Sequence, residues 1–263
     1  MFARFEVYGE WLKADPAGFA VYLVYFAVAV LLSLILHECA HGYVALQCGD
    51  PTAKMMGRLT LDPRRHLDPI GTVCMVVLGF GWARPVPVNP RNYRNIRRDD
   101  FLVSIAGITV NLTMFIVCTG LSVLVNRLMV GEDIYAAYNT GVLERAELYH
   151  LMRNIILFGG ASLPAELSAM LASPWLQYVQ RFLLMMAMMN LPLAVFNLLP
   201  FPPLDGFRLL NNALKGRLRM TAQTFQILRA GLLILCLTGL LGRVLGTVTD
   251  VLDSAVLNVF MRL

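Results

Sequence analysis

Long stretches without charge alternate with short basic segments along this chain. The first stretch, residues 19–36, holds 18 positions without a charged side chain. As a helix it would rise about 27 Å, close to the ~30 Å hydrocarbon thickness of a bilayer. The same pattern predicts four membrane-spanning helices, over residues 17–47, 101–126, 175–199 and 225–248.

The composition agrees with this pattern. Of the 263 residues, 57% are hydrophobic and only 15% are charged, whereas soluble domains carry roughly 25% charged residues. We therefore predict an all-α polytopic membrane protein whose surroundings are the lipid bilayer. A single domain is expected over residues 1–263, with an interfacial helix at 1–16, a core at 17–210, and a C-terminal span and tail at 211–263.

The charged residues are distributed unevenly between the predicted loops. Residues 50–68, 82–100 and 208–219 are basic, and the positive-inside rule places all three segments in the cytoplasm. Residues 127–175 carry three bases and five acids, which predicts an external segment. The formal net charge of +5 therefore indicates topology and lipid contact, and we expect no nucleic-acid partner.

Shorter elements are predicted between the spans. The apolar segment 69–81 has 13 residues, too few for an ordinary span, and both of its flanks are predicted to be cytoplasmic. We expect it to re-enter and return to the same side. Alternating residues predict short strands at 58–62 and 85–88. An interfacial helix is expected at 146–158 and a weakly amphipathic tail at 250–263.

Candidate chemistry lies at the end of the first span, where His37, Glu38 and His41 form an H-E-x-x-H pattern. On a helix, side chains four positions apart share a face, so both imidazoles can reach one metal ion. Glu38 can then act as general base for a water beside that ion. Ionisable residues at membrane depth are costly and mark functional sites, which disfavours a chance match.

A catalytic zinc ion usually has three protein ligands, so a third residue is needed. His150 falls in the external segment. His66 falls on the cytoplasmic side, in a turn where a hydrogen-bonded role is favoured. Asp205 is the better candidate, because it follows a span that returns to the same face and because prolines within 200–203 interrupt the helix before it. Gly206 permits a close approach or an unusual turn beside it.

Several separated motifs carry a resemblance to a known family. They are His37-Glu38-Cys39-Ala40-His41, Gly57-Arg58-Leu59-Thr60-Leu61-Asp62-Pro63, His66-Leu67-Asp68-Pro69-Ile70-Gly71, Gly81-Trp82-Ala83-Arg84-Pro85-Val86-Pro87-Val88-Asn89, Ala106-Gly107-Ile108-Thr109-Val110-Asn111 and the segment from Asn197 to Gly206. Over roughly residues 20–210 the chain resembles the site-2 protease family, the intramembrane zinc metalloproteases. Family members often have proline where this chain has Ile108, a departure that leaves the metal site untouched.

The resemblance implies that His37, His41 and Asp205 bind one zinc ion per chain, that Glu38 is the catalytic base and that Asn197 lies near the scissile peptide. It implies cleavage of peptide bonds within or near transmembrane segments of membrane protein substrates, as in regulated intramembrane proteolysis. By the predicted topology the active site faces the cytoplasmic side. We expect the compact form of the family, without an appended peptide-binding or nucleotide-sensing domain.

Other functions compete with proteolysis. A membrane zinc carrier would also place histidine and aspartate at depth, and a chaperone could bind membrane helices around a structural zinc ion, but neither needs Glu38. Four histidines are too few for a di-iron membrane oxidase. The five scattered cysteines indicate small buried residues and not disulfides, and the pattern carries no information on oligomeric state.

Gly107 and Asn111 lie four positions apart on the second span. This spacing is typical of a helix-packing face, and packing with an interhelical hydrogen bond is favoured over a catalytic role. The methionines at 185, 186, 188 and 189 are interpreted as flexible or lipid-facing packing residues rather than as a metal relay.

Overall fold

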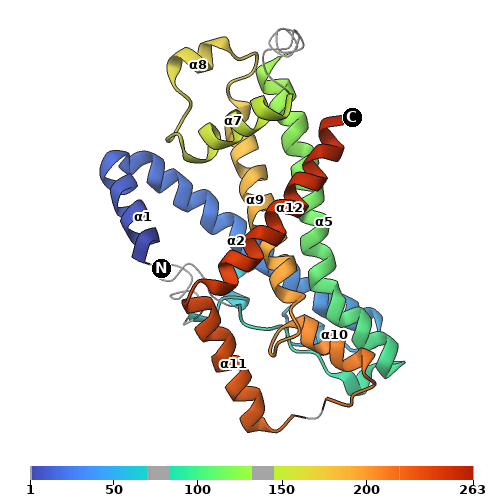
Figure 1. The fold of residues 1–263 in the computed structure, drawn as a ribbon. Helices are drawn as coiled ribbons and strands as arrows, with labels where there is room; N and C mark the ends of the chain where they lie inside the picture. Colours follow the sequence, from blue (N-terminus) through green and yellow to red (C-terminus); the bar gives the residue numbers. More distant parts are fainter. Residues whose placement is uncertain (1, 70, 72–82, 132–144, 219, 263) are drawn as a thin grey trace. The chain divides into compact units, whose positions relative to one another are not determined.

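A computed structural model describes residues 2–69, 71, 83–131, 145–218 and 220–262 of the chain. Over these residues the chain forms ten α-helices and two short 3-10 helices, and no strand (Figure 1). Four helices are long and apolar enough to cross a membrane: α2 (Pro16–Gln47), α5 (Ile96–Val130), α9 (Leu176–Asn197) and α12 (Leu240–Arg262). The prediction of an all-α polytopic membrane protein is confirmed.

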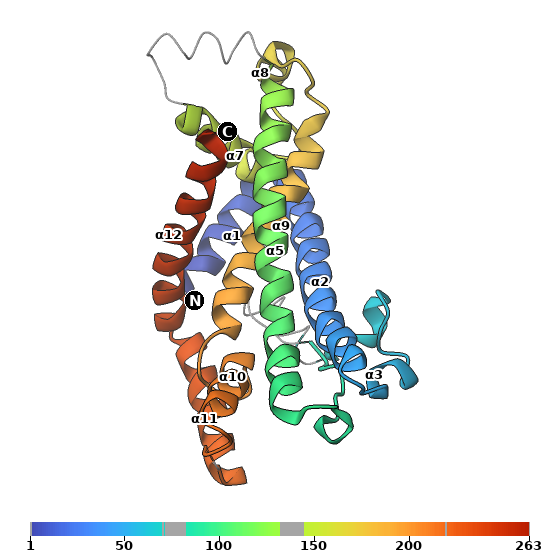
Figure 2. The same cartoon turned by 90° about the vertical axis from the view of Figure 1, so that its right-hand side faces the viewer.

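The chain divides into two compact units. The first holds Leu31–Thr113 and Asn190–Thr249, and the second holds Phe2–Val30, Met114–Met189 and Asp250–Leu263. Each of the four long helices, which Figure 2 shows from a second side, contributes residues to both units. The expectation of a single domain stays a prediction.

Three of the predicted spans are confirmed, although their ends differ. α5 begins at Ile96 and not at residue 101, so its first turns carry charge. Asn95 caps this end, because its Oδ1 accepts from the Arg98 N–H at 3.1 Å and its own N–H donates to Asp99 Oδ2 at 2.8 Å. This reciprocal cap satisfies groups that the start of a helix leaves free, so the helix begins within the charged segment.

The predicted fourth span, residues 225–248, is wrong. Two helices occupy this region, α11 (Ala222–Leu237) and α12, and they are separated at Thr238 and Gly239. Gly239 has φ +74°, the left-handed conformation that commonly ends a helix. α12 continues through the predicted tail, where Asp253 forms an ion pair of 2.6 Å with Arg153 Nη1. That pairing lets a charged residue lie in an apolar helix.

The predicted strands at 58–62 and 85–88 are also wrong. Apart from an isolated antiparallel bridge between Leu67 and Ala83, the described part of the chain contains no β-structure. The second segment carries two prolines, which have no N–H to give to a ladder. The expected re-entrant segment 69–81 lies outside the described residues except at its positions 69 and 71.

Side chains connect these two segments where a sheet was expected. Arg58 Nη2 donates to the carbonyls of Arg84 at 2.8 Å and Pro85 at 3.2 Å. The same region contains three short helices: α3 (Thr52–Met55), η1 (Pro63–Arg65) and η2 (Pro90–Asn92). Charge-assisted bonds to main-chain carbonyls are stronger than neutral ones, so Arg58 can hold the two segments together without a ladder.

Asp50 holds the turn that follows α2. Its buried carboxylate accepts hydrogen bonds from the N–H groups of Asn89 at 2.6 Å and Thr52 at 3.1 Å, from Asn92 Nδ2 at 2.7 Å and from the Thr52 hydroxyl. Burial acts to raise the pKa of Asp50, but these hydrogen bonds outweigh it, so the pKa lies below its ordinary value. The carboxylate therefore ties the end of α2 to the segment 89–92.

The second unit also contains α1 (Phe2–Ala14), α7 (Arg145–Phe158) and α8 (Ala165–Met170). The helices predicted at 1–16 and 146–158 are confirmed, and their interfacial location stays a prediction. Tyr8 and Trp11 of α1 pack against Phe19 and Tyr22 of α2, with ring centroids 5.1–6.5 Å apart. These aromatic contacts fix α1 on the start of α2.

Candidate metal centre

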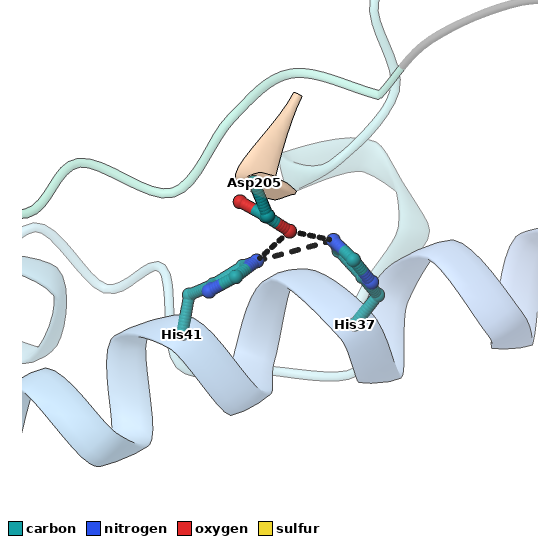
Figure 3. Close-up of side chains that lie close together, drawn as sticks. All are labelled: His37, His41 and Asp205. Carbon is teal, nitrogen blue, oxygen red and sulfur yellow. Dashed lines mark hydrogen bonds and ion pairs between the residues drawn. The ribbon is translucent and has the colours of Figure 1, made fainter. Parts of the chain in front are cut away.

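Two histidines of α2 and one aspartate of α10 (Asp205–Ala213) meet in the first unit. His37 and His41 lie one turn apart on one face of α2, and both are buried. Their Nε2 atoms are 3.1 Å apart, and Asp205 Oδ2 lies 3.2 Å from Nε2 of His37 and 3.1 Å from Nε2 of His41. Figure 3 shows the three side chains converging on one point. The structure therefore brings together the three residues that the sequence predicts as metal ligands.

The distances between these three atoms fit a divalent cation. Around a tetrahedral zinc ion with bonds of about 2.0–2.1 Å, neighbouring ligand atoms are roughly 3.3–3.4 Å apart. The observed separations of 3.1–3.2 Å are close to this value. One cation would satisfy all three lone pairs at once, and two imidazoles with a carboxylate are a ligand set of catalytic zinc sites.

Asp205 is held in its ionised form. Burial acts to raise the pKa of this carboxyl, but the hydrogen bonds and charges of His37 and His41 outweigh it, so the pKa lies below its ordinary value. A ligand carboxyl must be deprotonated to bind a metal ion. Without a metal ion, this effect comes from Nε2 protons on the two imidazoles, and a bound cation would replace those protons and their charge. Asp205 would then be ionised in both cases, as a ligand carboxylate must be.

Gly206 determines how closely α10 starts against the end of α9. α9 ends at Asn197, and the chain turns before α10 begins at Asp205. A Cβ on Gly206 would lie 2.5 Å from the carbonyl oxygen of Leu199 and closer still to that of Leu198. Main-chain atoms cannot rotate away as a side chain can, so this approach requires glycine. The expectation of a close approach at Gly206 is confirmed.

α10 is fastened to the beginning of α5. Arg208 Nη2 lies 3.2 Å from Asp100 Oδ1, and Asn212 Nδ2 donates to the Arg97 carbonyl at 2.8 Å and to Asp100 Oδ2 at 3.3 Å. These contacts set the orientation of the helix whose first residue is Asp205. The same α5 supports the two histidines further along its length.

α5 supports both imidazoles from behind. His41 Nδ1 donates to the Val103 carbonyl at 2.6 Å, which leaves Nε2 as the nitrogen with the free lone pair. A Cβ on Gly107 would lie 2.5 Å from His41 Nε2, 2.6 Å from His37 Nδ1 and closer still to His37 Cε1. The packing face that the sequence predicts at Gly107 therefore makes room for the two rings.

Glu38 is bound to the segment 84–89, which contacts α2. Its Oε2 accepts a hydrogen bond from the Val86 N–H at 2.7 Å, and its side chain is half-buried. Gly42 admits this segment, because a Cβ there would lie 2.9 Å from Val86 Cγ1. Sequence reasoning missed Val86 as a partner of Glu38. The available signal was its place between Pro85 and Pro87, which leaves it the single N–H donor of three consecutive residues.

The other candidates lie apart from this group. His66 is buried, and its Nε2 lies 2.8 Å from the Thr60 carbonyl, as expected for a hydrogen-bonded turn residue. His150 is an exposed residue of α7 in the second unit. Asn197 Nδ2 donates to the Leu193 carbonyl of its own helix at 3.0 Å. The role of Asn197 near a scissile peptide stays a prediction.

Fold and site together define a class. Four helices that could cross a membrane, with a buried His-His-Asp group and a glutamate next to its first histidine, are the features of a multi-pass membrane protein with a metalloprotease-type centre. The sequence profile of peptidase family M50, the site-2 protease family, matches residues 25–238. The chain belongs to this family, as its motifs predict.

Named relatives agree with this assignment. The chain is 38% identical over 188 residues to "Putative zinc metalloprotease YwhC" of Bacillus subtilis (strain 168), with 72% of this chain and 68% of that protein aligned. It is 35% identical over 113 residues to "Putative zinc metalloprotease Rip2" of Mycobacterium tuberculosis, with 40% of this chain and 43% of that protein aligned. No solved structure matches the chain significantly. The family and these relatives support a zinc metalloprotease.

Proposed function

We propose that this chain is an intramembrane zinc metalloprotease, which hydrolyses peptide bonds within or near the transmembrane segments of membrane proteins. One observation carries the proposal: His37 Nε2, His41 Nε2 and Asp205 Oδ2 lie within 3.2 Å of one another, and both histidines belong to a helix that could cross a membrane. Burying ionisable groups in an apolar helix costs free energy, so their presence there marks a functional site. The names of the relatives support zinc as the metal.

The proposed roles follow from the surroundings of each residue. His37, His41 and Asp205 hold one zinc ion per chain, which when bound supplies a Lewis acid and lowers the pKa of a water molecule to about 7. Glu38 takes the proton of the attacking water and returns it to the leaving amine. To do so, its carboxylate exchanges the Val86 N–H for water and substrate.

Asn197 is proposed to assist at the scissile carbonyl. Its Nδ2 lies on the last residue of α9 and donates to the Leu193 carbonyl at 3.0 Å. That neutral intrahelical bond is inexpensive to exchange, and an amide donor aimed at a developing oxyanion stabilises the transition state. The turn that follows Asn197 leads directly to Asp205, which supports placing the donor beside the metal centre.

The proposed substrates are membrane-spanning helices of other proteins, cut as a step of regulated intramembrane proteolysis after trimming outside the membrane. A helix hides its carbonyls in internal hydrogen bonds, so the substrate must unwind before it is cut. The segments 58–62 and 85–88 are proposed to hold the unwound chain by pairing with its main chain. The basic segments 50–68, 82–100 and 208–219 support an active site on the cytoplasmic side.

The test compares wild type with Glu38→Gln, both purified in detergent, on a panel of single-span test substrates. Zinc content and cleavage are measured on the same samples. We expect one zinc ion per chain in both proteins and cleavage by wild type alone, with the variant slower by at least about 100-fold because the base is lost. Asp205→Asn is the matched control for the metal, and we expect it to lose zinc and cleavage together.

Two outcomes would contradict the proposal. Zinc in both proteins with cleavage in neither, together with zinc flux into liposomes, would identify a carrier. Zinc in both proteins with stable binding of the test helices and no cleavage would identify a chaperone of membrane helices.

A further inference from the structure

Asn111 of α5 is a buried polar residue that the roles described so far leave unused. It has no exposed surface, and among the described residues neither its Nδ2 nor its Oδ1 has a hydrogen-bond partner. The interhelical hydrogen bond favoured from the sequence is therefore wrong for this side chain. An amide with both halves unsatisfied is unfavourable in a folded interior, and more so inside a membrane-spanning helix. Packing alone would be served better by an apolar residue.

Asn111 lies on the α5 face that contacts the metal centre. It is one helical turn beyond Gly107, whose Cα lies against both imidazoles. His41 contacts Val103 and His37 lies at Gly107, so α2 and α5 run antiparallel here and position 33 is next opposite position 111. One turn is about 5.4 Å, roughly the length of one and a half extended residues. A peptide that occupies the metal centre would therefore extend to the level of Asn111, and it reaches the buried amide once it displaces the side chains that cover it.

Neighbouring helices also present polar groups at this level. Ser33 Oγ accepts a hydrogen bond from Asn190 Nδ2 of α9 at 2.8 Å, and both residues are buried. Ser33 is one turn before His37, just as Asn111 is one turn beyond Gly107. The polar positions of α2, α5 and α9 thus form one layer of the first unit, on the side of the metal centre away from the end of α2.

A primary amide has the same donor and acceptor as a peptide group. Its Nδ2 can donate to a carbonyl while its Oδ1 accepts from an N–H. A transmembrane helix that unwinds for cleavage exposes both groups where no water can satisfy them. We infer that Asn111 binds the main chain of the unwound substrate, on the membrane-interior side of the scissile bond and without regard to side-chain sequence. This inference rests on the proposed function.

The first experiment measures affinity for substrate. The probe is a fluorescent synthetic single-span peptide that the wild type cleaves, and all proteins carry Glu38→Gln so that the bound peptide stays intact. Asn111→Leu keeps the number and branching of the side-chain heavy atoms and removes both hydrogen-bonding groups. Thr119→Val is the matched control, because Thr119 is buried on the same helix and its Oγ1 is also without a partner among the described residues. Zinc content and thermal unfolding are measured on the same samples.

We expect Asn111→Leu to weaken peptide binding by about 10- to 30-fold, the effect of losing two neutral hydrogen bonds. Thr119→Val should bind the peptide as the parent does. Both variants should keep their zinc and unfold at the same or a higher temperature, because each loses an unsatisfied polar group.

The second experiment locates the contact on the substrate. One main-chain N–H of the probe is replaced by an ester oxygen, at successive positions around the cleavage site. At one position we expect the ester to weaken binding about 3- to 10-fold in the presence of Asn111 and to have no effect with Asn111→Leu. Equal losses in both proteins at every position would overturn the inference.

Other outcomes separate the alternatives. Unchanged peptide affinity with a lower unfolding temperature or less zinc would make Asn111 a packing residue. Unchanged affinity with unchanged stability and zinc content would leave the amide without a role in substrate binding. Either result overturns the inference alone. A zinc-loaded wild type that cleaves none of the test peptides would overturn the proposed function and this inference with it.

Discussion

Gly107 allows a quantitative prediction about the metal centre. Gly107→Ala would place a methyl group 2.5 Å from His41 Nε2, 2.6 Å from His37 Nδ1 and closer still to His37 Cε1. Non-bonded carbon atoms prefer about 3.5–4.0 Å, so the two rings must move by roughly 1 Å. Metal sites tolerate deviations of only about 0.2 Å in ligand distance. Losing one supporting contact typically lowers metal affinity 10- to 100-fold, and here both histidines move, so we expect a fall of at least about 100-fold.

The assay is a zinc competition titration with a chromogenic chelator, with thermal unfolding of the metal-free protein measured in parallel. Gly120→Ala is the control. Gly120 lies on α5, as Gly107 does, but in the second unit, and a methyl group there would lie 2.8 Å from the ring of Phe260. Overpacking costs about 1–3 kcal/mol, so both variants should lose similar stability while only Gly107→Ala loses zinc affinity. Wild-type zinc affinity in Gly107→Ala would refute the proposed crowding of the imidazoles.

Two further predictions concern Asp205 and Asp50. Gly206→Ala would crowd the main-chain oxygens of Leu198 and Leu199, so α10 must shift. We expect the zinc affinity, measured by titration, to fall at least about 100-fold, while the helix content measured by circular dichroism stays unchanged. Zinc binding at wild-type affinity would contradict this prediction. The lowered pKa of Asp50 means that its stabilisation is complete above the unfolded pKa of about 3.9 and is lost as the pH falls through the folded pKa. Asp50→Asn should therefore unfold at a lower temperature near pH 7 and lose less stability on acidification than the wild type; parallel pH profiles would count against the hydrogen bonds to Asp50.

The group of His37, His41 and Asp205 could be predicted because the spacing of these residues and the face that each span reaches follow from the sequence. His37 and His41 share a helix face by periodicity alone. Two features of the sequence predict Asp205 as the third residue of the group. The third span ends on the same face as the first, and prolines within 200–203 interrupt the helix before Asp205. The pairing of Asp205 with both imidazoles follows from these local facts, since only one carboxylate is brought to that level by the third span.

Other features depend on contacts that no local pattern encodes. The apolar residues on either side of Gly239 predict one continuous span, because the hydrophobic pattern contains no information on the positive φ of Gly239 that separates α11 from α12. The segments 58–62 and 85–88 alternate as strands do, but a strand needs a partner ladder. The main chain of 85–88 bonds instead to the side chains of Arg58 and Glu38, and the Thr60 carbonyl bonds to those of Cys39 and His66. The role of Gly107 depends on which residues of another helix face it.

The distance in sequence between the metal ligands has a consequence for biosynthesis. Asp205 follows His41 by 164 positions and begins a short helix that must itself fold against α5. At roughly 5–20 residues per second, about 10–30 s of translation separate the two ligand sets. During this interval the nascent chain carries its histidines and its glutamate without the aspartate that completes the cluster. Under the proposed function, the nascent chain therefore cannot cut neighbouring membrane helices before Asp205 has been synthesised and placed against α5.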